Sequence, residues 1–205
     1  MTKIILVRHG HVQGIDPVRF RGRLELPLTA IGKRQADATA KRIQACWIPA
    51  AIYTSPMQRS VATAQTIAAP FGLPVQPVER LNDIDYGDWQ GLAVEEARSR
   101  WPDEIESWFR TPHQTHVPGG EALLAVLSRT SAVLRETHLN HPDEVVVIVG
   151  HESVNRVMLL HMLGLPLSAY WRLAQEPCAI NELDFARDEW TVGSINETWH
   201  LHGIS

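Results

Sequence analysis

Short apolar runs and longer stretches with helical spacing alternate along the chain. The apolar runs are rich in branched residues and predict buried strands at Lys3 to Val7, Ala51 to Thr54 and Val145 to Val149. Apolar residues three and four positions apart predict four helices. The first begins at Thr29, and the others run from Ser55-Pro56 to Ala69, from Gly119-Gly120 to about His138, and from His151 to Leu163. Apolar strands separated by helices are typical of a mainly parallel sheet covered by helices on both faces. The pattern therefore predicts an α/β fold.

The remaining segments complete this picture. We expect an extended piece at Leu73 to Val78, and two hairpin-like runs at Ala179 to Phe185 and Trp190 to Ile195. Residues 86–118 are irregular, with three tryptophans, three prolines and short helical fragments around Val94 to Arg100 and Glu104 to Phe109. We interpret residues 86–118 as an insertion over the sheet of a single domain that spans residues 1–205.

Composition narrows the class of protein. The chain has 205 residues, 44% of them hydrophobic, which is enough for a core that needs neither disulfides nor a structural metal. Cys46 and Cys178 form no CxxC pattern and are expected to be buried free thiols of a reducing compartment. The first apolar run is too short for a signal peptide, and no stretch approaches the ~20 residues of a membrane span. We expect a cytoplasmic protein without membrane partners.

Charge is distributed unevenly along the chain. Residues 1–42 hold nine Lys or Arg against three acidic residues, although the whole chain carries a net charge of -4. The sequence pI is about 6.2, and no run of Lys or Arg is interleaved with aromatic residues. We therefore expect no nucleic-acid partner.

Polar residues follow three of the predicted strands. They are Arg8, His9 and Gly10, then Ser55 and Arg59, then Gly150 and His151. Ligands of open α/β sheets bind beyond the carboxyl ends of the strands, where unpaired helix N–H groups also gather. A single histidine there is usually a hydrogen-bonded structural residue, and an arginine in a first helical turn usually faces solvent. Two histidines and two arginines at equivalent strand ends instead favour an anion pocket suited to phosphate.

Six segments resemble the histidine phosphatase superfamily, which has a phosphoglycerate-mutase-like fold. They are LVRHG after the first strand, RFRGRLELPLTAIGKRQA at 19–36, SPMQRSVATAQTIA at 55–68, LNDIDYGDWQGL at 81–92, PGGEAL at 118–123 and VIVGH at 147–151. Their order and spacing match across nearly the whole chain, and the match extends into LGLPLSAYWRL at 163–173.

The resemblance implies a metal-independent phosphatase that hydrolyses a small-molecule phosphomonoester. His9 would be the nucleophile that forms a phosphohistidine intermediate. Arg8, Arg59 and His151, together with Gly10, would bind the phosphate and stabilise its charge, so neither a metal nor another cofactor is implied. Asp83 would be the general acid and base, at the position where the family usually has glutamate.

The general acid is one of three departures from the family pattern. Asp85 lies two residues after Asp83, and in an extended segment both carboxylates would point to one face. We favour Asp83 by register, and the alternative is that both acids only cap the following turn.

The other departures lie in the phosphate pocket. Glu152 follows the second histidine, where the family commonly has glycine. It either points away from the phosphate or contacts a cationic or hydroxyl part of the substrate, which makes it a candidate specificity residue. The family's asparagine beyond RHG is missing, since His11, Val12 and Ile15 stand in that stretch. Arg21 could complete the phosphate shell or could equally be exposed to solvent.

Three rival functions deserve comparison. HESVN at 151–155 resembles the zinc protease pattern, but Asn155 stands at the second histidine position and Met158 at the glycine. A phosphoglycerate mutase-type phosphoryl transfer is the second rival, and the segment between Gly91 and Gly120 has no Arg-Arg pair for a second anionic group. The third is a catalytically inactive phosphate-binding scaffold, which the departures suggest and the retained histidines and arginines oppose.

The leaving group of the substrate has no readable code in the sequence. In the loop at 111–118, His113 and His116 are candidates to reach it. Sugar phosphates, phosphoglycerates and nucleotide-derived phosphates all fit the motif. The edge strands near the C-terminus could be free or could pair in a homodimer.

Overall fold

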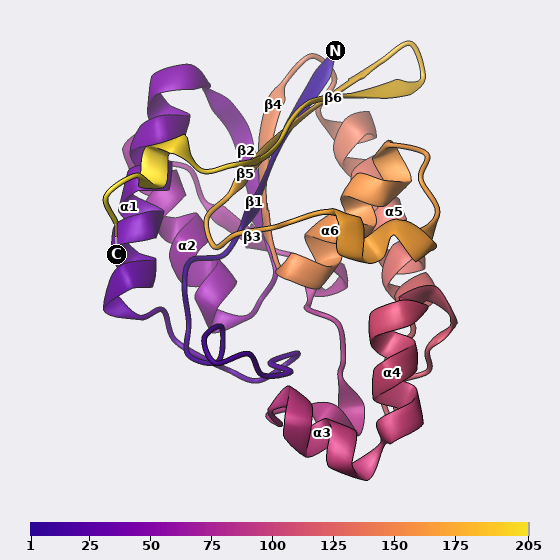
Figure 1. Cartoon of the computed structure of the whole chain (residues 1–205). Coiled ribbons are helices and arrows are strands. Elements are labelled where there is room, and N and C mark those ends of the chain that lie inside the picture. The colour runs from indigo at the N-terminus through magenta and orange to yellow at the C-terminus, as the bar shows by residue number, and fades with distance from the viewer. Residues whose placement is uncertain (205) are drawn as a thin grey trace.

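The computed structural model describes residues 1–204 and contains one six-stranded sheet (Figure 1). The strands are β1 (Thr2–Arg8), β2 (Pro49–Thr54), β3 (Val75–Pro77), β4 (Val145–Gly150), β5 (Ile180–Ala186) and β6 (Glu189–Glu197), in the order β3-β2-β4-β1-β5-β6. Neighbours are parallel from β3 to β1, whereas β5 and β6 are antiparallel. The predicted α/β fold with a mainly parallel sheet is confirmed.

Helices cover both faces of the sheet, as Figure 1 shows. On one face lie α1 (Ala30–Cys46) and α2 (Gln58–Ala68), and on the other lie α5 (Leu123–Asn140) and α6 (Glu152–Met162). Successive residues of β1 serve the two faces in turn: Ile5 packs in the core that includes α1 and α2, and Ile4 in the core that includes α5 and α6. This alternation follows from the two-residue period of a strand.

The segment at 86–118 contains α3 (Val94–Arg100) and α4 (Pro102–Arg110), close to the predicted fragments. It lies beyond the carboxyl ends of the strands, at the lower right of Figure 1. Trp89 and Trp108 are almost fully buried and belong to the same core as α5 and α6. Packing, rather than exposure to a ligand, therefore accounts for most of their surface.

Two predicted helix starts are wrong. α2 begins at Gln58 instead of Pro56 with Ser55 as its N-cap, because the Ser55 hydroxyl accepts a hydrogen bond from the Met57 amide (3.3 Å) and holds a bend before the helix. α5 begins at Leu123 instead of Gly119, where the backbone has a positive φ of 67° that suits a turn.

The prediction of buried thiols is confirmed for Cys178 and is wrong for Cys46, which lies at the C-terminal end of α1. Cys46 is exposed and Cys178 is buried, and both are free. Within residues 1–204, no helix is long and apolar enough to cross a bilayer.

Candidate active site

Three parallel strands bring the predicted site residues to one edge of the sheet. Arg8 ends β1 level with Gly150 of β4, and Thr54 ends β2 level with Val149. The amide of His9 donates to the Gly150 carbonyl (3.0 Å), so the ladder continues one residue past the strand. His9, His151 and the start of α2 are therefore neighbours, as the strand-end argument predicts.

His9 is held with its Nε2 atom carrying the lone pair. Its Nδ1 lies 2.7 Å from the Gly10 carbonyl, which can only accept, so Nδ1 carries the proton. Its Nε2 accepts from Arg59 Nε at 3.1 Å. Burial, together with the charges of Arg59 and Arg8, holds the pKa of His9 well below its usual value. The imidazole is therefore neutral near pH 7 and presents a nucleophilic nitrogen.

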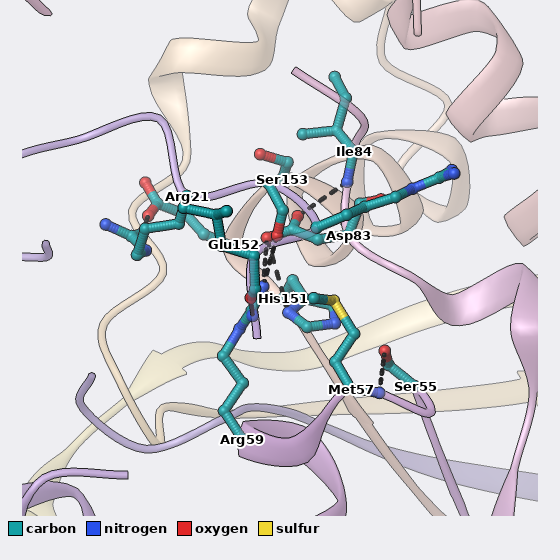
Figure 2. A network of polar contacts seen from close by, with 12 residues as sticks. Arg21, Ser55, Met57, Arg59, Asp83, Ile84, His151, Glu152 and Ser153 are labelled. Atoms are coloured by element: carbon teal, nitrogen blue, oxygen red, sulfur yellow. Dashed lines mark hydrogen bonds and ion pairs between the residues drawn. The ribbon is translucent and has the colours of Figure 1, made fainter. Parts of the chain in front are cut away.

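Arg59 connects this nucleophile to Asp83. Besides His9, the buried guanidinium donates to the carbonyls of Leu24 and Gly22, each at 2.7 Å, and to Asp83 Oδ2 at 3.1 Å. Figure 2 shows Arg59 reaching the Asp83 carboxylate beside His151. Two fixed carbonyls orient the guanidinium, so its position does not depend on a ligand.

Asp83 has the properties of a proton donor. Burial raises its pKa above the usual value, although the charges of Arg59 and Arg21 act in the opposite direction. Its Oδ2 lies 3.6 Å from His151 Nδ1, and its Oδ1 accepts from the Ile84 amide (2.9 Å). Burial and the Arg59 charge also lower the pKa of His151, which is therefore neutral.

Asp85 has different partners from Asp83. Its carboxylate accepts from the Gly87 amide (2.9 Å) and pairs with Arg23 (3.5 Å). Asp85 does not line the cavity that opens beside Arg8 and Glu152. Asp85 therefore caps a turn, which is the role that the alternative interpretation gave to both Asp83 and Asp85. Asp83 lines the cavity instead.

Several buried side-chain nitrogen atoms at the site have no hydrogen-bond partner among the described residues. They are Arg8 Nε and Nη2, Arg21 Nε and His151 Nδ1. Arg8 Nη2 lies 3.0 Å from Glu152 Oε2, within ion-pair distance but outside hydrogen-bond geometry. A buried donor without a partner is costly, and acceptor oxygens of a bound anion would satisfy donors of this kind.

Glu152 lies among arginines and is partly buried, with 28% of its side chain exposed. Its Oε2 is 3.0 Å from Arg8 and 3.3 Å from Arg21, and its Oε1 is 2.8 Å from Arg156. Burial alone would raise the pKa of this carboxyl, but the charges of Arg8, Arg156 and Arg21 hold it below the usual value. Arg21, which could have been exposed, is thereby turned toward the site, and it also donates to the Gly14 carbonyl.

A cavity of about 400 Å³ extends outward from Arg8, Asp83 and Glu152. Its outer wall is largely aromatic and consists of Phe20, Tyr86, Trp108, Phe109, Tyr170 and Trp171. His113 and His116 are exposed and do not line it, so the structure does not bring these two candidates to the site. The amide of Gly10 donates to Thr63 Oγ1 (3.1 Å), and its part in phosphate binding stays a prediction.

Sequence reasoning missed two arginines. Arg156 follows Glu152 by four residues, a spacing that places both on one face of α6 and could have identified the pair. Arg129 of α5 donates to the carbonyls of Arg80, Asn82 and Asp83, and no sequence signal indicated this distant contact.

A metal site would require several His, Cys, Asp or Glu side chains close together. Among residues 1–204, no three His, Cys, Asp or Glu side chains are grouped so that they could hold an ion. In the HESVN segment, the Asn155 amide is buried against Gln175 (3.4 Å) and His161 is exposed. The ligand arrangement of a zinc protease is not formed.

Comparison with known proteins identifies relatives over the whole chain. The model of the family described as "Histidine phosphatase superfamily (branch 1)" matches residues 4–198. Phosphoserine phosphatase 1 of Hydrogenobacter thermophilus is 32% identical, with 98% of this chain and 95% of the relative covered. The metal-independent phosphoserine phosphatase of Arabidopsis thaliana is 28% identical, with 100% and 85% covered. The structure of Bacillus stearothermophilus YhfR superposes with a TM-score of 0.93 at 27% identity, covering 98% and 100%.

Proposed function

Because the chain belongs to the histidine phosphatase superfamily (branch 1), we propose that it hydrolyses a small-molecule phosphomonoester through a phosphohistidine on His9, without a metal. One observation supports this most strongly. The lone pair of His9 Nε2 lies within a group of buried donors from Arg8, Arg21, Arg59 and His151, several of them without a partner. Such a group suits the oxygens of a phosphoryl group in transfer.

In the first step, His9 Nε2 attacks phosphorus and the bond between phosphorus and the ester oxygen breaks. Arg8, Arg59 and His151 donate to the equatorial oxygens, and Arg59 Nε exchanges His9 for a phosphate oxygen. The proton of Asp83 passes to the leaving oxygen, so the leaving group departs as an alcohol. The raised pKa of Asp83 favours the protonated form that supplies this proton.

In the second step, a water molecule attacks the phosphohistidine and the phosphorus–nitrogen bond breaks. The Asp83 carboxylate, ionised by the first step, takes one proton of the water. Inorganic phosphate leaves, and His9 Nε2 regains its lone pair. Both steps need only one acid–base group, because the same carboxyl alternates between its two states.

The two relatives named as phosphoserine phosphatases make phosphoserine a reasonable first substrate to test. The cavity is larger than a three-carbon leaving group requires, so the wider class of small phosphomonoesters belongs in the same panel. A cytoplasmic location stays a prediction, and so does pairing through the edge strand β6.

Hydrolysis of p-nitrophenyl phosphate in the presence of EDTA tests the proposed function. We expect turnover by the wild type, retained by the exposed-site control His113→Ala and lost in His9→Ala. Quench of the wild type during turnover in alkaline denaturant, which preserves the acid-labile phosphorus–nitrogen bond, should trap phosphate on His9, detected by mass spectrometry. Turnover that needs added metal, or that persists in His9→Ala, would contradict the proposal.

A further inference from the structure

Glu152 places a negative charge beside a site built for anions. Of the residues that line the cavity, Arg8, Arg21 and Arg156 contribute three guanidinium groups around this single carboxylate. Without it, these arginines would form a second anion site next to the phosphate position. With it, each of the three already has a carboxylate oxygen within 3.3 Å.

Arg156 is fixed by more than its pair with Glu152. Its Nε donates to the Leu173 carbonyl (2.7 Å), and its guanidinium carbon lies 5.2 Å and 5.0 Å from the ring centroids of Tyr170 and Trp171. Stacking on two aromatic rings and a backbone acceptor restrict the rotation of the side chain. Arg156 therefore cannot turn toward a substrate anion without losing several contacts.

The carboxylate is close to the place of the leaving group. Glu152 and Asp83 line the same cavity, and the charge of Glu152 is one of the causes that raise the pKa of Asp83. Figure 2 shows Glu152 between Arg21 and the Asp83–His151 pair. Since Asp83 donates its proton to the ester oxygen, the first atoms of the leaving group lie beside both carboxyl groups.

We propose that Glu152 is a charge filter, which disfavours phosphomonoesters with an anion next to the phosphate and favours those with a cationic or neutral group there. This inference rests on the proposed function, because it assigns the leaving-group side of the same site. Like charges held close together in a buried site repel strongly, whereas an ammonium or hydroxyl group can bind the carboxylate. Phosphoethanolamine and glycerol 3-phosphate represent the favoured class, and 3-phosphoglycerate represents the disfavoured one.

Four esters of similar size provide the test, and they differ in the charge of the group attached to the phosphate. This group is cationic in phosphoethanolamine, zwitterionic in phosphoserine, neutral in glycerol 3-phosphate and anionic in 3-phosphoglycerate. Their Kd values are measured by calorimetry on His9→Ala, which does not consume them, and on His9→Ala combined with Glu152→Gln. Glu176→Gln in the same background is the matched control, because Glu176 also lines the cavity but is exposed and has no ion pair among the described residues.

With Glu152 present, we expect 3-phosphoglycerate to bind at least about tenfold more weakly than glycerol 3-phosphate, and phosphoethanolamine at least as tightly as glycerol 3-phosphate. Glu152→Gln should abolish or reverse this order, because it removes the negative charge and leaves the guanidinium groups of Arg8 and Arg21 free to pair with a second anion. Glu176→Gln should leave the order unchanged. Glu152→Thr, checked for thermal unfolding, repeats the experiment in case the glutamine variant folds poorly.

Equal affinity for the neutral and anionic esters in the presence of Glu152 would overturn the inference. An unchanged order of affinities in Glu152→Gln would also overturn it, and so would the absence of binding of any ester. A uniform loss of affinity for all four esters in Glu152→Gln would overturn it too, because it would mean that Glu152 only orders the arginines. Failure of the proposed function has a separate signature. It appears as no metal-independent turnover of p-nitrophenyl phosphate by the wild type, whereas the binding series requires no turnover.

Discussion

At the scale of single residues, burial shifts the pKa values of the nucleophile and of the acid in opposite directions. Burial disfavours the charged form of any group, so it lowers the pKa of His9 and raises that of Asp83. Burial therefore favours the unprotonated imidazole and, at the nearby carboxyl, the protonated form. Arg59 contacts both groups and keeps them in a fixed relation.

Replacement of the acid should distinguish Asp83 from Asp85. We expect Asp83→Asn to lower kcat for alkyl phosphates by about 10²- to 10⁴-fold, because no proton reaches the leaving oxygen. The loss should be much smaller for p-nitrophenyl phosphate, whose leaving anion is stable without protonation. Asp85→Asn, the matched control, should keep most of the activity with both substrates. The reverse result would transfer the role of acid to Asp85.

The pH profile supplies a second test of Asp83. The raised pKa means that the protonated, active form is lost as pH rises through that value, so kcat/KM for alkyl phosphates should fall on the alkaline side. His9 must be neutral, so activity should also fall when pH drops through its lowered pKa. In Asp83→Asn the alkaline fall that Asp83 causes should disappear. An identical alkaline limb in this variant would show that another group titrates there.

The strand-end argument placed His9, Arg59 and His151, because each follows a strand or a helix start, where position determines neighbours. Asp83 was assigned through the family resemblance and its register. It failed where the position of a side chain depends on distant chain segments. The partners of Glu152 come from β1, the 20s loop and its own helix, and only the last has a local spacing. The distinction between Asp83 and Asp85 likewise depends on Arg59 and Arg23, which no local rule brings together.

At the scale of elements, the loop after β1 is held by close contact with α1. A Cβ atom added at Gly32 would lie 2.2 Å from the His11 carbonyl oxygen, and one at Gly10 would lie 2.5 Å from the Gly32 carbonyl oxygen. Thr29 caps the same helix by accepting from the Gly32 amide (3.1 Å). The start of α1 therefore fixes the backbone that carries His9.

Gly32→Ala should disturb both stability and activity. The methyl group meets backbone atoms that cannot rotate away, so we expect a loss of about 1–3 kcal/mol in the free energy of unfolding and a reduced kcat. Lys33→Ala, on the exposed face of the same helix, controls for the substitution itself. Urea denaturation and p-nitrophenyl phosphate turnover measure the two effects. Wild-type values of both for Gly32→Ala would show that the loop can move without consequence.

Helix α5 contributes a positioning residue for the acid. Arg129 donates to the carbonyls of Arg80 and Asn82 (2.7 Å each) and of Asp83 (3.2 Å), and it pairs with Glu121 (3.0 Å). Three backbone acceptors on one guanidinium fix the segment that carries the carboxyl group. A small displacement of that group is enough to impair proton transfer.

Arg129→Met should therefore lower kcat for alkyl phosphates, by up to about 10²-fold, more than it lowers kcat for p-nitrophenyl phosphate. Arg135→Met, at an exposed position of the same helix, should have little effect. The ratio of the two substrates is the informative measurement, because general loss of structure would reduce both rates equally. An unchanged ratio in Arg129→Met would reduce Arg129 to a purely structural role.

At the scale of the whole molecule, the sheet was predictable and the cavity was not. Apolar runs and helical spacing determine which segments form strands and helices, and the parallel pairs β1–β4 and β2–β4 bring their ends to one edge. The cavity combines residues from the loop at 15–22, α4, α6 and the segment at 170–176. Its shape depends on how these distant pieces pack, which periodicity along the chain does not encode.

Burial of both site histidines should make the fold sensitive to acid. The pKa values of His9 and His151 are lowered in the folded state, so between their ordinary value of 6.5 and the folded values the unfolded chain binds more protons. Stability must therefore fall as pH drops below about 6.5, by up to about 1.4 kcal/mol per pH unit for each histidine. Asp83 opposes this at lower pH, because its raised pKa lets the folded state take up a proton first.

Thermal unfolding of His9→Gln/His151→Gln should show a flatter dependence on pH than the wild type, and exposed-site His113→Gln should not. Equal slopes in the wild type and the double variant would mean that other groups cause the acid sensitivity.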